Sequence, residues 1–145
     1  MDIAKLVEFG TANDFSPQGG GWLVGYGDNF KNPTLRRMAK NALAHTVGLK
    51  WMVHKTGDPN GTNKPISDGC TISILISETG DFRLEFSTRS DFADTSKGIY
   101  LQDRLTEMGD FVVWSGGIHH KWAVHADSTI LTVRWVPIEH WSHRD

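Results

Sequence analysis

The amino-acid sequence predicts a single all-β domain that folds as a barrel or a sandwich. A chain of 145 residues has the length of one domain. From about residue 46 onward, short strand-like segments recur roughly every ten residues with turn residues between them, as in sandwiches and barrels. The hydrophobic fraction of 39% and the charged fraction of 22% are ordinary for a globular protein. No apolar stretch approaches the roughly 18 residues that a membrane helix needs.

The N-terminal third of the sequence predicts a short irregular or helical extension. The glycines at 19–21 exclude a long helix across this part, and 22–26 has the composition of a short strand. The alanine and leucine content of 35–44 fits a short helix, although an extended segment is the alternative. We therefore expect an extension that packs on the barrel, the barrel itself and a tail, at residues 1–45, 46–137 and 138–145.

Alternation of apolar and polar residues predicts the strands of the barrel. Isoleucines at every second position indicate a strand over 70–77, and alternating phenylalanine and leucine indicate another over 82–87. Turn residues at 78–81 separate these two strands, which predicts a β-hairpin. The further strands are expected at 47–54, 100–105, 111–114, 119–125 and 129–136.

Composition and the absence of several motifs exclude whole classes of function. The single cysteine, Cys70, excludes a disulfide framework and a cysteine-rich zinc site. A formal charge of −2 and a pI near 6.4 argue against nucleic acid as the main partner. Neither a phosphate loop nor a Gly-x-Ser-x-Gly nucleophile elbow is present. Because the first residues carry no export signal and the sequence has no membrane helix, we expect a cytoplasmic protein without a membrane partner.

The segment from Gly109 to His120 resembles the second conserved motif of the cupins. That motif is a glycine, five residues, a proline, one residue, a second glycine, two residues and a histidine, and Gly109, Gly117 and His120 match it. Ser115 replaces the proline, and Val124 stands where an asparagine is common. The resemblance covers about residues 47–136. It implies a single cupin-type barrel, a double-stranded β-helix or jelly roll, whose cavity receives the His120 imidazole.

The metal ligands of the first cupin motif are missing. That motif supplies two histidines one residue apart and a glutamate, yet no His-x-His occurs before residue 119, and Ser73 or Thr71 stands where the glutamate belongs. We therefore expect no metal and no other cofactor. A site built from His54 and His120, with His119 or Glu85, is the alternative.

The remaining candidate site residues depend on which strand faces line the cavity. Alternation places Trp122 on the same face as His120. Lys50 and His54 share another strand face, which either points inward near His120 or is solvated. Three further candidates lie on faces that are either luminal or outward: Arg83, Glu85 and Arg134.

With these faces inward, the cavity would be rich in cations. Such a cavity favours an anionic or strongly polar small molecule, because charges attract more strongly away from bulk water. The first hypothesis is a ligand-binding cupin that senses or sequesters a metabolite. The second is a metal-independent isomerase, dehydratase or lyase with His120 or His54 as general base. A metal-dependent dioxygenase is the third, and whether the protein is an enzyme stays open at this stage.

The resemblance also bears on assembly. Cupins often pair through their outer sheet faces, so we expect a homodimer. The apolar row on the strand at 70–77 is one possible contact, and it consists of Ile72, Ile74 and Ile76.

Overall fold

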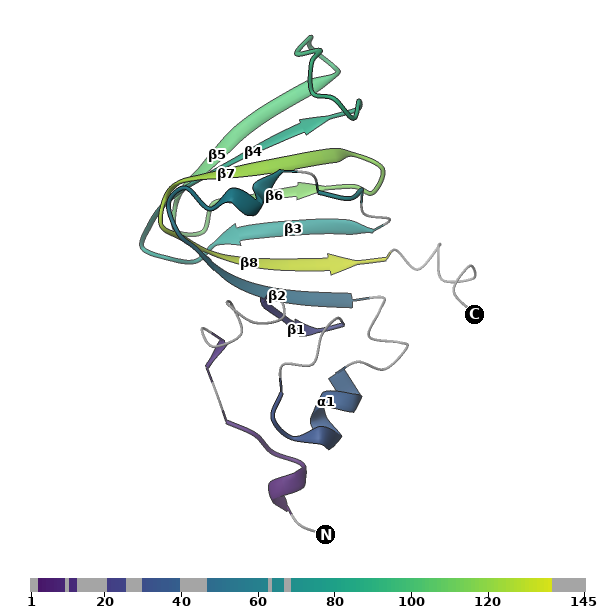
Figure 1. Cartoon of the computed structure of the whole chain (residues 1–145), viewed down its shortest axis with the longest axis vertical. Coiled ribbons are helices and arrows are strands. Elements are labelled where there is room, and N and C mark those ends of the chain that lie inside the picture. The colour runs from purple at the N-terminus through teal and green to yellow at the C-terminus, as the bar shows by residue number, and fades with distance from the viewer. Residues whose placement is uncertain are drawn as a thin grey trace.

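Two antiparallel β-sheets make up most of the structure. The computed structural model describes residues 3–9, 11–12, 21–25, 30–39, 47–62, 64–66 and 69–136. The larger sheet has the order β1 (Trp22–Val24), β2 (Val47–His54), β8 (Ser128–Trp135), β3 (Cys70–Leu75) and β6 (Phe111–Trp114). The smaller sheet has the order β5 (Tyr100–Glu107), β4 (Thr79–Ser87) and β7 (His119–Ala126), as Figure 1 shows. This arrangement confirms the predicted all-β barrel or sandwich.

The core lies between the two sheets. Along β3 and β4, buried and half-buried residues alternate, because successive side chains of a strand point to opposite faces. The buried apolar side chains of both sheets form one cluster, and removing this apolar area from water is the main force that holds the sheets together. Its members are Leu75, Phe82, Leu84, Phe86, Leu105, Val124 and Ile130.

The predicted hairpin between 70–77 and 82–87 is wrong. β3 pairs with β6 and β8, whereas β4 pairs with β5 and β7, so the two strands belong to opposite sheets. The short connection crosses from one sheet to the other, and Ser77 Oγ accepts a hydrogen bond from the backbone of Thr129 on β8 at 3.1 Å. The crossing places Leu75, on the inner face of β3, against the apolar inner face of β4 across the interior, which a hairpin within one sheet would not allow.

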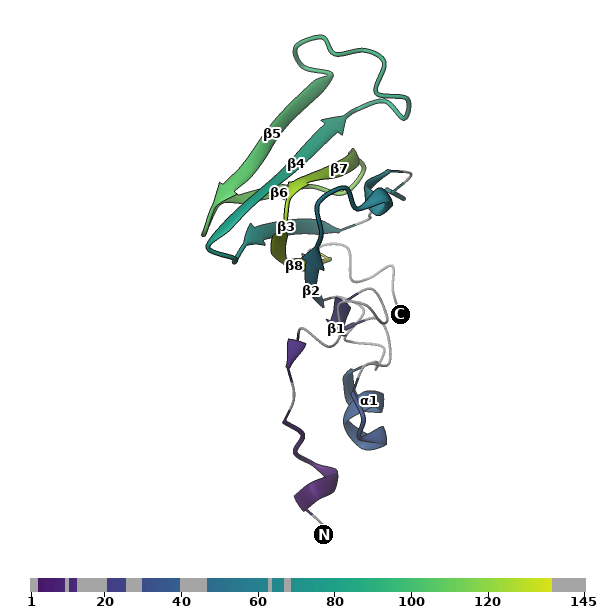
Figure 2. The ribbon, with the colours of Figure 1, turned by 60° about the vertical axis from the view of Figure 1, so that its left-hand side comes forward.

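The N-terminal part contributes one strand to the larger sheet. β1 pairs with β2 along its edge, with Trp22 opposite Lys50. The 3-10 helix η1 (Ile3–Lys5) and the helix α1 (Pro33–Ala39) lie beyond this edge, away from the smaller sheet (Figures 1 and 2). Glu8 links these two elements, because its carboxylate accepts hydrogen bonds from the backbone of residues 31 and 32 at 3.1 and 2.7 Å.

Residues 138–145, predicted as a tail, lie outside the described residues. Within the described ranges, no helix has both the length and the apolar character needed to cross a membrane.

Candidate ligand-binding cavity

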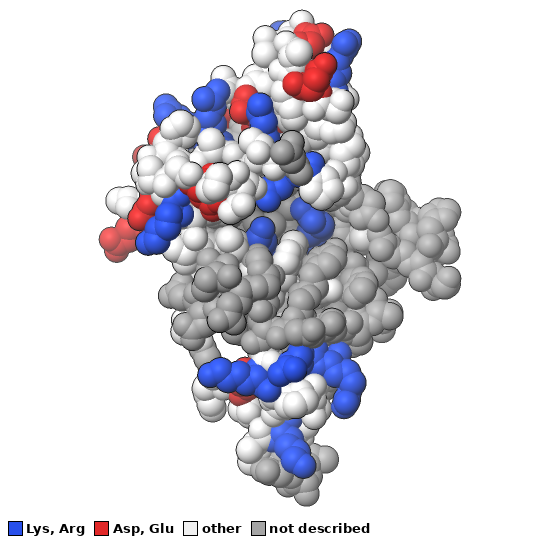
Figure 3. Space-filling view, in the orientation of Figure 1, with Lys and Arg blue, Asp and Glu red and all other residues white. Residues whose placement is uncertain are grey.

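A cavity of about 220 Å³ opens between the inner faces of the two sheets. Strands of both sheets line it, together with the loop that follows the 3-10 helix η5 (Pro59–Gly61). Figure 3 shows Lys and Arg side chains gathered in a hollow near the middle of the face viewed. The lining residues are Trp22, Lys50, His54, Lys64, Pro65, Thr71, Ser73, Phe82, Leu84, Trp114, His120, Trp122, Thr132 and Arg134.

Two larger recesses lie between the edge strands β5 and β6. Their volumes are about 450 and 520 Å³, and Phe86, Leu101 and Val112 line both of them. Neither contains a histidine. A third recess, of about 370 Å³, lies on the outer face of the smaller sheet and is lined by Arg83, Gln102, Asp103, Arg104 and His125. A small cavity with convergent polar groups is the better candidate for specific binding, because a few well-placed polar groups supply specificity.

His120 lies on β7 with its imidazole turned inward, and only 8% of the residue is exposed. Its ring centroid is 5.1 Å from that of Trp114. Among the described residues, Nδ1 of His120 has no hydrogen-bond partner. Burial is the main cause that lowers the pKa of His120 to about 4, and the positive charges of Arg134, Lys64 and Lys50 contribute to the same shift. The ring is therefore neutral at pH 7, with a nitrogen available to a ligand.

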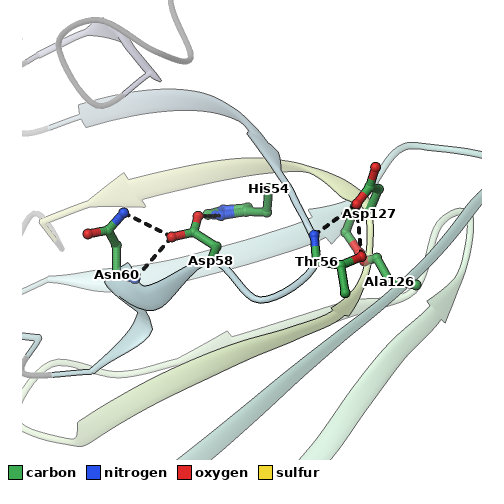
Figure 4. A network of polar contacts seen from close by, with 7 residues as sticks. His54, Thr56, Asp58, Asn60, Ala126 and Asp127 are labelled. Atoms are coloured by element: carbon green, nitrogen blue, oxygen red, sulfur yellow. Dashed lines mark hydrogen bonds and ion pairs between the residues drawn. The ribbon is translucent and has the colours of Figure 1, made fainter.

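His54, the last residue of β2, is fixed by a carboxylate. Its Nδ1 lies 3.1 Å from Oδ2 of Asp58, and Asp58 in turn accepts hydrogen bonds from the backbone and side-chain nitrogens of Asn60 at 3.0 and 2.9 Å (Figure 4). The His54 ring also packs edge-on against Trp122, with 4.5 Å between centroids. With Nδ1 engaged by Asp58, Nε2 is the nitrogen that remains for a bound molecule.

Burial and hydrogen bonding act in opposite directions on this pair. Burial lowers the pKa of His54, and it outweighs the hydrogen bond to Asp58, which raises the pKa. For Asp58, burial raises the pKa, but the hydrogen bonds from Asn60 and His54 outweigh it and hold the pKa below its usual range. The state favoured near neutral pH is therefore a neutral imidazole beside an ionised carboxylate.

Three cations line the cavity. Lys50 on β2 and Arg134 on β8 both lie over the Trp22 ring, at 5.8 and 5.6 Å from its centroid. Lys64, from the loop after η5, lies 5.2 Å from the ring centroid of Trp122. None of the described lining residues is a carboxylate. Positive charge is therefore concentrated in a partly dry space whose described wall holds no acidic side chain.

Neutral hydrogen-bonding groups accompany the cations. Arg134 donates from Nε to Thr71 Oγ1 at 3.0 Å, which orients the guanidinium group. The hydroxyl groups of Ser73 and Thr132 bond to each other across β3 and β8 at 2.8 Å. Nε1 of Trp114 is buried without a hydrogen-bond partner among the described residues. Buried polar groups are normally paired, so among the described residues this donor in a cavity-lining side chain is left unused.

The structure brings together five of the seven residues predicted for the site. These five line the cavity: His120, His54, Lys50, Trp122 and Arg134. Because β8 pairs with both β2 and β3, it places Arg134 beside Thr71 on the inner face, while Lys50 enters from the neighbouring strand.

Arg83 and Glu85 do not lie in the cavity. They occupy the outer face of β4, because the apolar residues that alternate with them fill the interior. There Arg83 donates a hydrogen bond to Gln102 Oε1, and Glu85 accepts one from the Tyr100 hydroxyl and forms an ion pair with Lys121 at 3.8 Å. The expectation that these two residues bind the ligand is therefore corrected: they belong to a network on the outer surface.

Sequence reasoning missed Asp58, Lys64 and Trp22. The first two lie in loops, where no periodicity shows the direction of a side chain. One signal was available on β3, where Thr71 and Ser73 alternate with the isoleucines. Both polar residues are buried, at 0% and 4% exposure, so the polar side of that strand faces the interior.

The residues present do not fit a divalent cation. No group of three or more His, Cys, Asp or Glu side chains within the described ranges is arranged to hold a metal ion. Instead, three cationic side chains share the cavity with the two histidines. A metal site normally needs three or four N, O or S ligands, and neighbouring ammonium and guanidinium groups would oppose a second positive charge.

Comparison with known proteins supports the fold. No protein-family model and no curated protein matches the chain. The structure of Streptomyces albus HEPD with 2-hydroxyethylphosphonate and Fe(II) bound is similar at a TM-score of 0.52 and 15% identity, over 69% of this chain and 20% of that chain. BH2720 from Bacillus halodurans has a TM-score of 0.48 and 12% identity, over 63% of each chain. This chain thus spans about a fifth of the length of HEPD. The structural likeness shows that the chain has a cupin-like fold.

Proposed function

We propose that this chain is a degenerate cupin that binds an anionic small molecule in the cavity between its sheets. The observation that carries the proposal is the charge of the wall: Lys50, Lys64 and Arg134 converge there, and no described lining residue is acidic. An anion would neutralise these cations in a site partly shielded from water, where the attraction is stronger than in bulk solution. The unused nitrogens of His120 and Trp114 would supply directional hydrogen bonds.

The volume of the cavity limits the size of the ligand. A cavity of about 220 Å³ is smaller than the roughly 300–1,000 Å³ typical of sites for drug-sized ligands. This favours an inorganic oxyanion or an organic acid of a few carbon atoms. Larger charged metabolites would extend out of the cavity.

Thermal unfolding in the presence of phosphate, sulfate, malonate and pyruvate tests this proposal. A ligand at 100 times its Kd stabilises the folded state by about 2.7 kcal/mol, so at least one anion is expected to raise the Tm. Arg134→Gln removes a cation from the cavity and is expected to abolish the shift. Arg83→Gln removes a cation from the outer face and is the matched control. An equal shift in both variants, or no shift with any anion in the wild type, contradicts the proposal.

A metal-independent isomerase, dehydratase or lyase is the second candidate. The pairing of His54 with Asp58 favours it, because a carboxylate that fixes one imidazole nitrogen prepares the other for proton transfer. Nearby cations would stabilise an enolate-like charge. Exchange of deuterium from solvent into a bound carbon acid, lost in His54→Gln, would distinguish this candidate from simple binding.

We also propose that a second copy of the chain covers the outer face of the larger sheet. Two apolar rows cross β2, β8, β3 and β6 in register, and none of the described side chains in them is charged. Phe111 and Val113 in these rows are 60% and 53% exposed. A two-fold axis would place the same apolar face on both partners, which makes it complementary to itself. The rows are Leu49, Val133, Ile72 and Val113, and Trp51, Leu131, Ile74 and Phe111.

A further inference from the structure

Lys50 occupies the position of an amine nucleophile within the cavity. It extends from the inner face of β2, opposite Thr132 on β8, and its Nζ lies 5.8 Å from the centroid of the Trp22 ring. Within the described residues Lys50 forms no ion pair, whereas the exposed Lys55 pairs with Asp127 at 3.6 Å. Among the described residues, the Trp22 ring and the more distant Asp58 favour the charged amine, but no carboxylate is in ion-pair contact with it.

The surroundings increase the neutral fraction of the amine. Burial is the main cause that lowers the pKa of Lys50 to about 8, Lys64 and Arg134 contribute to the lowering, and Asp58 opposes it. The two histidines of the cavity add no positive charge near neutral pH, because their pKa values are also lowered. With a pKa of about 8, roughly a tenth of the Lys50 amine is neutral at pH 7, against less than about 0.1% for an ordinary lysine.

A proton carrier lies on the same strand face as this amine. His54 follows Lys50 by four residues on β2 and lines the same cavity, with Nδ1 bonded to Asp58. Asp58 acts here as a positioning residue, since it holds the ring that would carry the proton. Arg134 and Lys64 remain to bind a negatively charged group.

We propose that Lys50 forms a Schiff base with the carbonyl carbon of a small 2-oxo acid bound in the cavity. The inference rests on the proposed anion site, which would hold the carboxylate next to the reacting carbonyl group. A 2-oxo acid combines an anionic handle and an electrophilic carbon in a molecule small enough for about 220 Å³.

The chemistry of this step is a condensation without net oxidation. The Lys50 nitrogen attacks the carbonyl carbon, a C–N bond forms, and the C–O bond breaks as the oxygen leaves in water with the two protons of the amine. Nε2 of His54 would carry a proton between nitrogen and oxygen during the loss of water. The resulting imine withdraws electrons from the neighbouring carbon and so prepares it for proton removal.

Reductive trapping tests the proposal on the intact chain. The protein is incubated at pH 7 with pyruvate and sodium cyanoborohydride, whose hydride converts an imine into a stable secondary amine, and the modified lysine is identified by peptide mass spectrometry. We expect Lys50 to be modified at least about tenfold faster than the exposed Lys97, because its neutral fraction is larger. Malonate, which binds as an anion but has no ketone, is expected to slow the modification of Lys50 and leave that of Lys97 unchanged.

Two outcomes would overturn the inference, and they differ from failure of the anion site. If malonate raises the Tm but pyruvate leaves Lys50 unmodified, the anion site stands and the Schiff base is wrong. Modification spread equally over Lys50 and Lys97 also rejects the Schiff base. If no anion raises the Tm, the proposed function itself fails. Lys50→Arg, which keeps the positive charge but removes the primary amine, is expected to lose the trapped adduct, while Lys97 is still modified at its slow rate.

Discussion

The carboxylate of Asp58 holds the imidazole of His54 at 3.1 Å, although the two residues lie on different elements, the end of β2 and the start of η5. The contact joins a loop to the wall of the cavity. It determines which nitrogen of His54 is left for a bound molecule, and it engages the Asp58 carboxylate, whose charge acts on Lys50 and Lys64.

Asp58→Asn is expected to lower the pKa of His54 further, because it removes the carboxylate that favours the protonated ring. A loss of about 1 kcal/mol in the free energy of unfolding should accompany it, as for a weakened buried hydrogen bond. The measurement is an NMR titration of the His54 ring. Asp127→Asn is the control. It weakens the hydrogen bond that Asp127, between β7 and β8, accepts from the backbone of Thr56 after β2, and it should leave the pKa of His54 unchanged. A higher or unaltered His54 pKa in Asp58→Asn would contradict this account.

Acidification is expected to destabilise the chain between about pH 6.5 and pH 4. Unfolded His120 takes up a proton near its ordinary pKa of 6.5, whereas the folded state resists protonation until about pH 4. The unfolded state thus binds more protons across this window, so stability falls as the pH falls. The contribution of His120 is up to about 3 kcal/mol. Urea unfolding at pH 7 and pH 4.5 should show a smaller loss in His120→Gln than in the wild type, and equal losses would argue against a buried neutral ring.

Gly61→Ala is expected to destabilise the chain by about 3 kcal/mol, since a Cβ at this position would lie 1.8 Å from the carbonyl oxygen of Trp122. The clash is with backbone, so η5 would have to move away from β7 and take Lys64 with it. Gly57→Ala, at a glycine with φ +78° and no neighbour within 4 Å, should cost only about 1 kcal/mol. Chemical denaturation of both variants measures the difference, and similar costs would contradict the close packing of η5 on β7.

Phe111→Asp is expected to convert a dimer into a monomer, because it would bury a charge in the apolar face of the larger sheet. Leu101→Asp is the matched control, since Leu101 is 70% exposed but lies on β5 in the smaller sheet. Sedimentation velocity of the wild type and both variants measures the masses. A monomeric wild type, or equal dissociation in both variants, would reject the second copy as the partner of this face.

The strands were predictable because burial on one face imposes a period of two, and β6 lies at the predicted residues 111–114. Which strands pair with each other was harder to predict from the sequence. The turn residues at 78–81 fit a hairpin, and only contacts with distant strands, such as that of β3 with β8, decide that the chain crosses between sheets. A local sequence signal does not contain that information.

The same distinction applies to the cavity. His120 and Trp122 could be placed together because they share a strand and a face. For β4, the period of two separates the residues into two faces but does not say which face points inward. Burying Phe82, Leu84 and Phe86 removes more apolar area from water, so the face with Arg83 and Glu85 points outward. Asp58 and Lys64 come from loops whose positions depend on packing that is distant in sequence, so the His54 partner and the third cation emerge only from the structure.

Isothermal titration calorimetry with phosphate, malonate and pyruvate tests the central claim, an anion site in the cavity, most directly. The account predicts that at least one of them binds with one anion per chain, that Lys50→Met/Arg134→Met abolishes this binding, and that Arg83→Met/Arg104→Met on the outer face preserves it. Circular dichroism would verify that both double variants keep their β-structure. Absence of binding by all three anions, or unchanged affinity in Lys50→Met/Arg134→Met, would contradict the account.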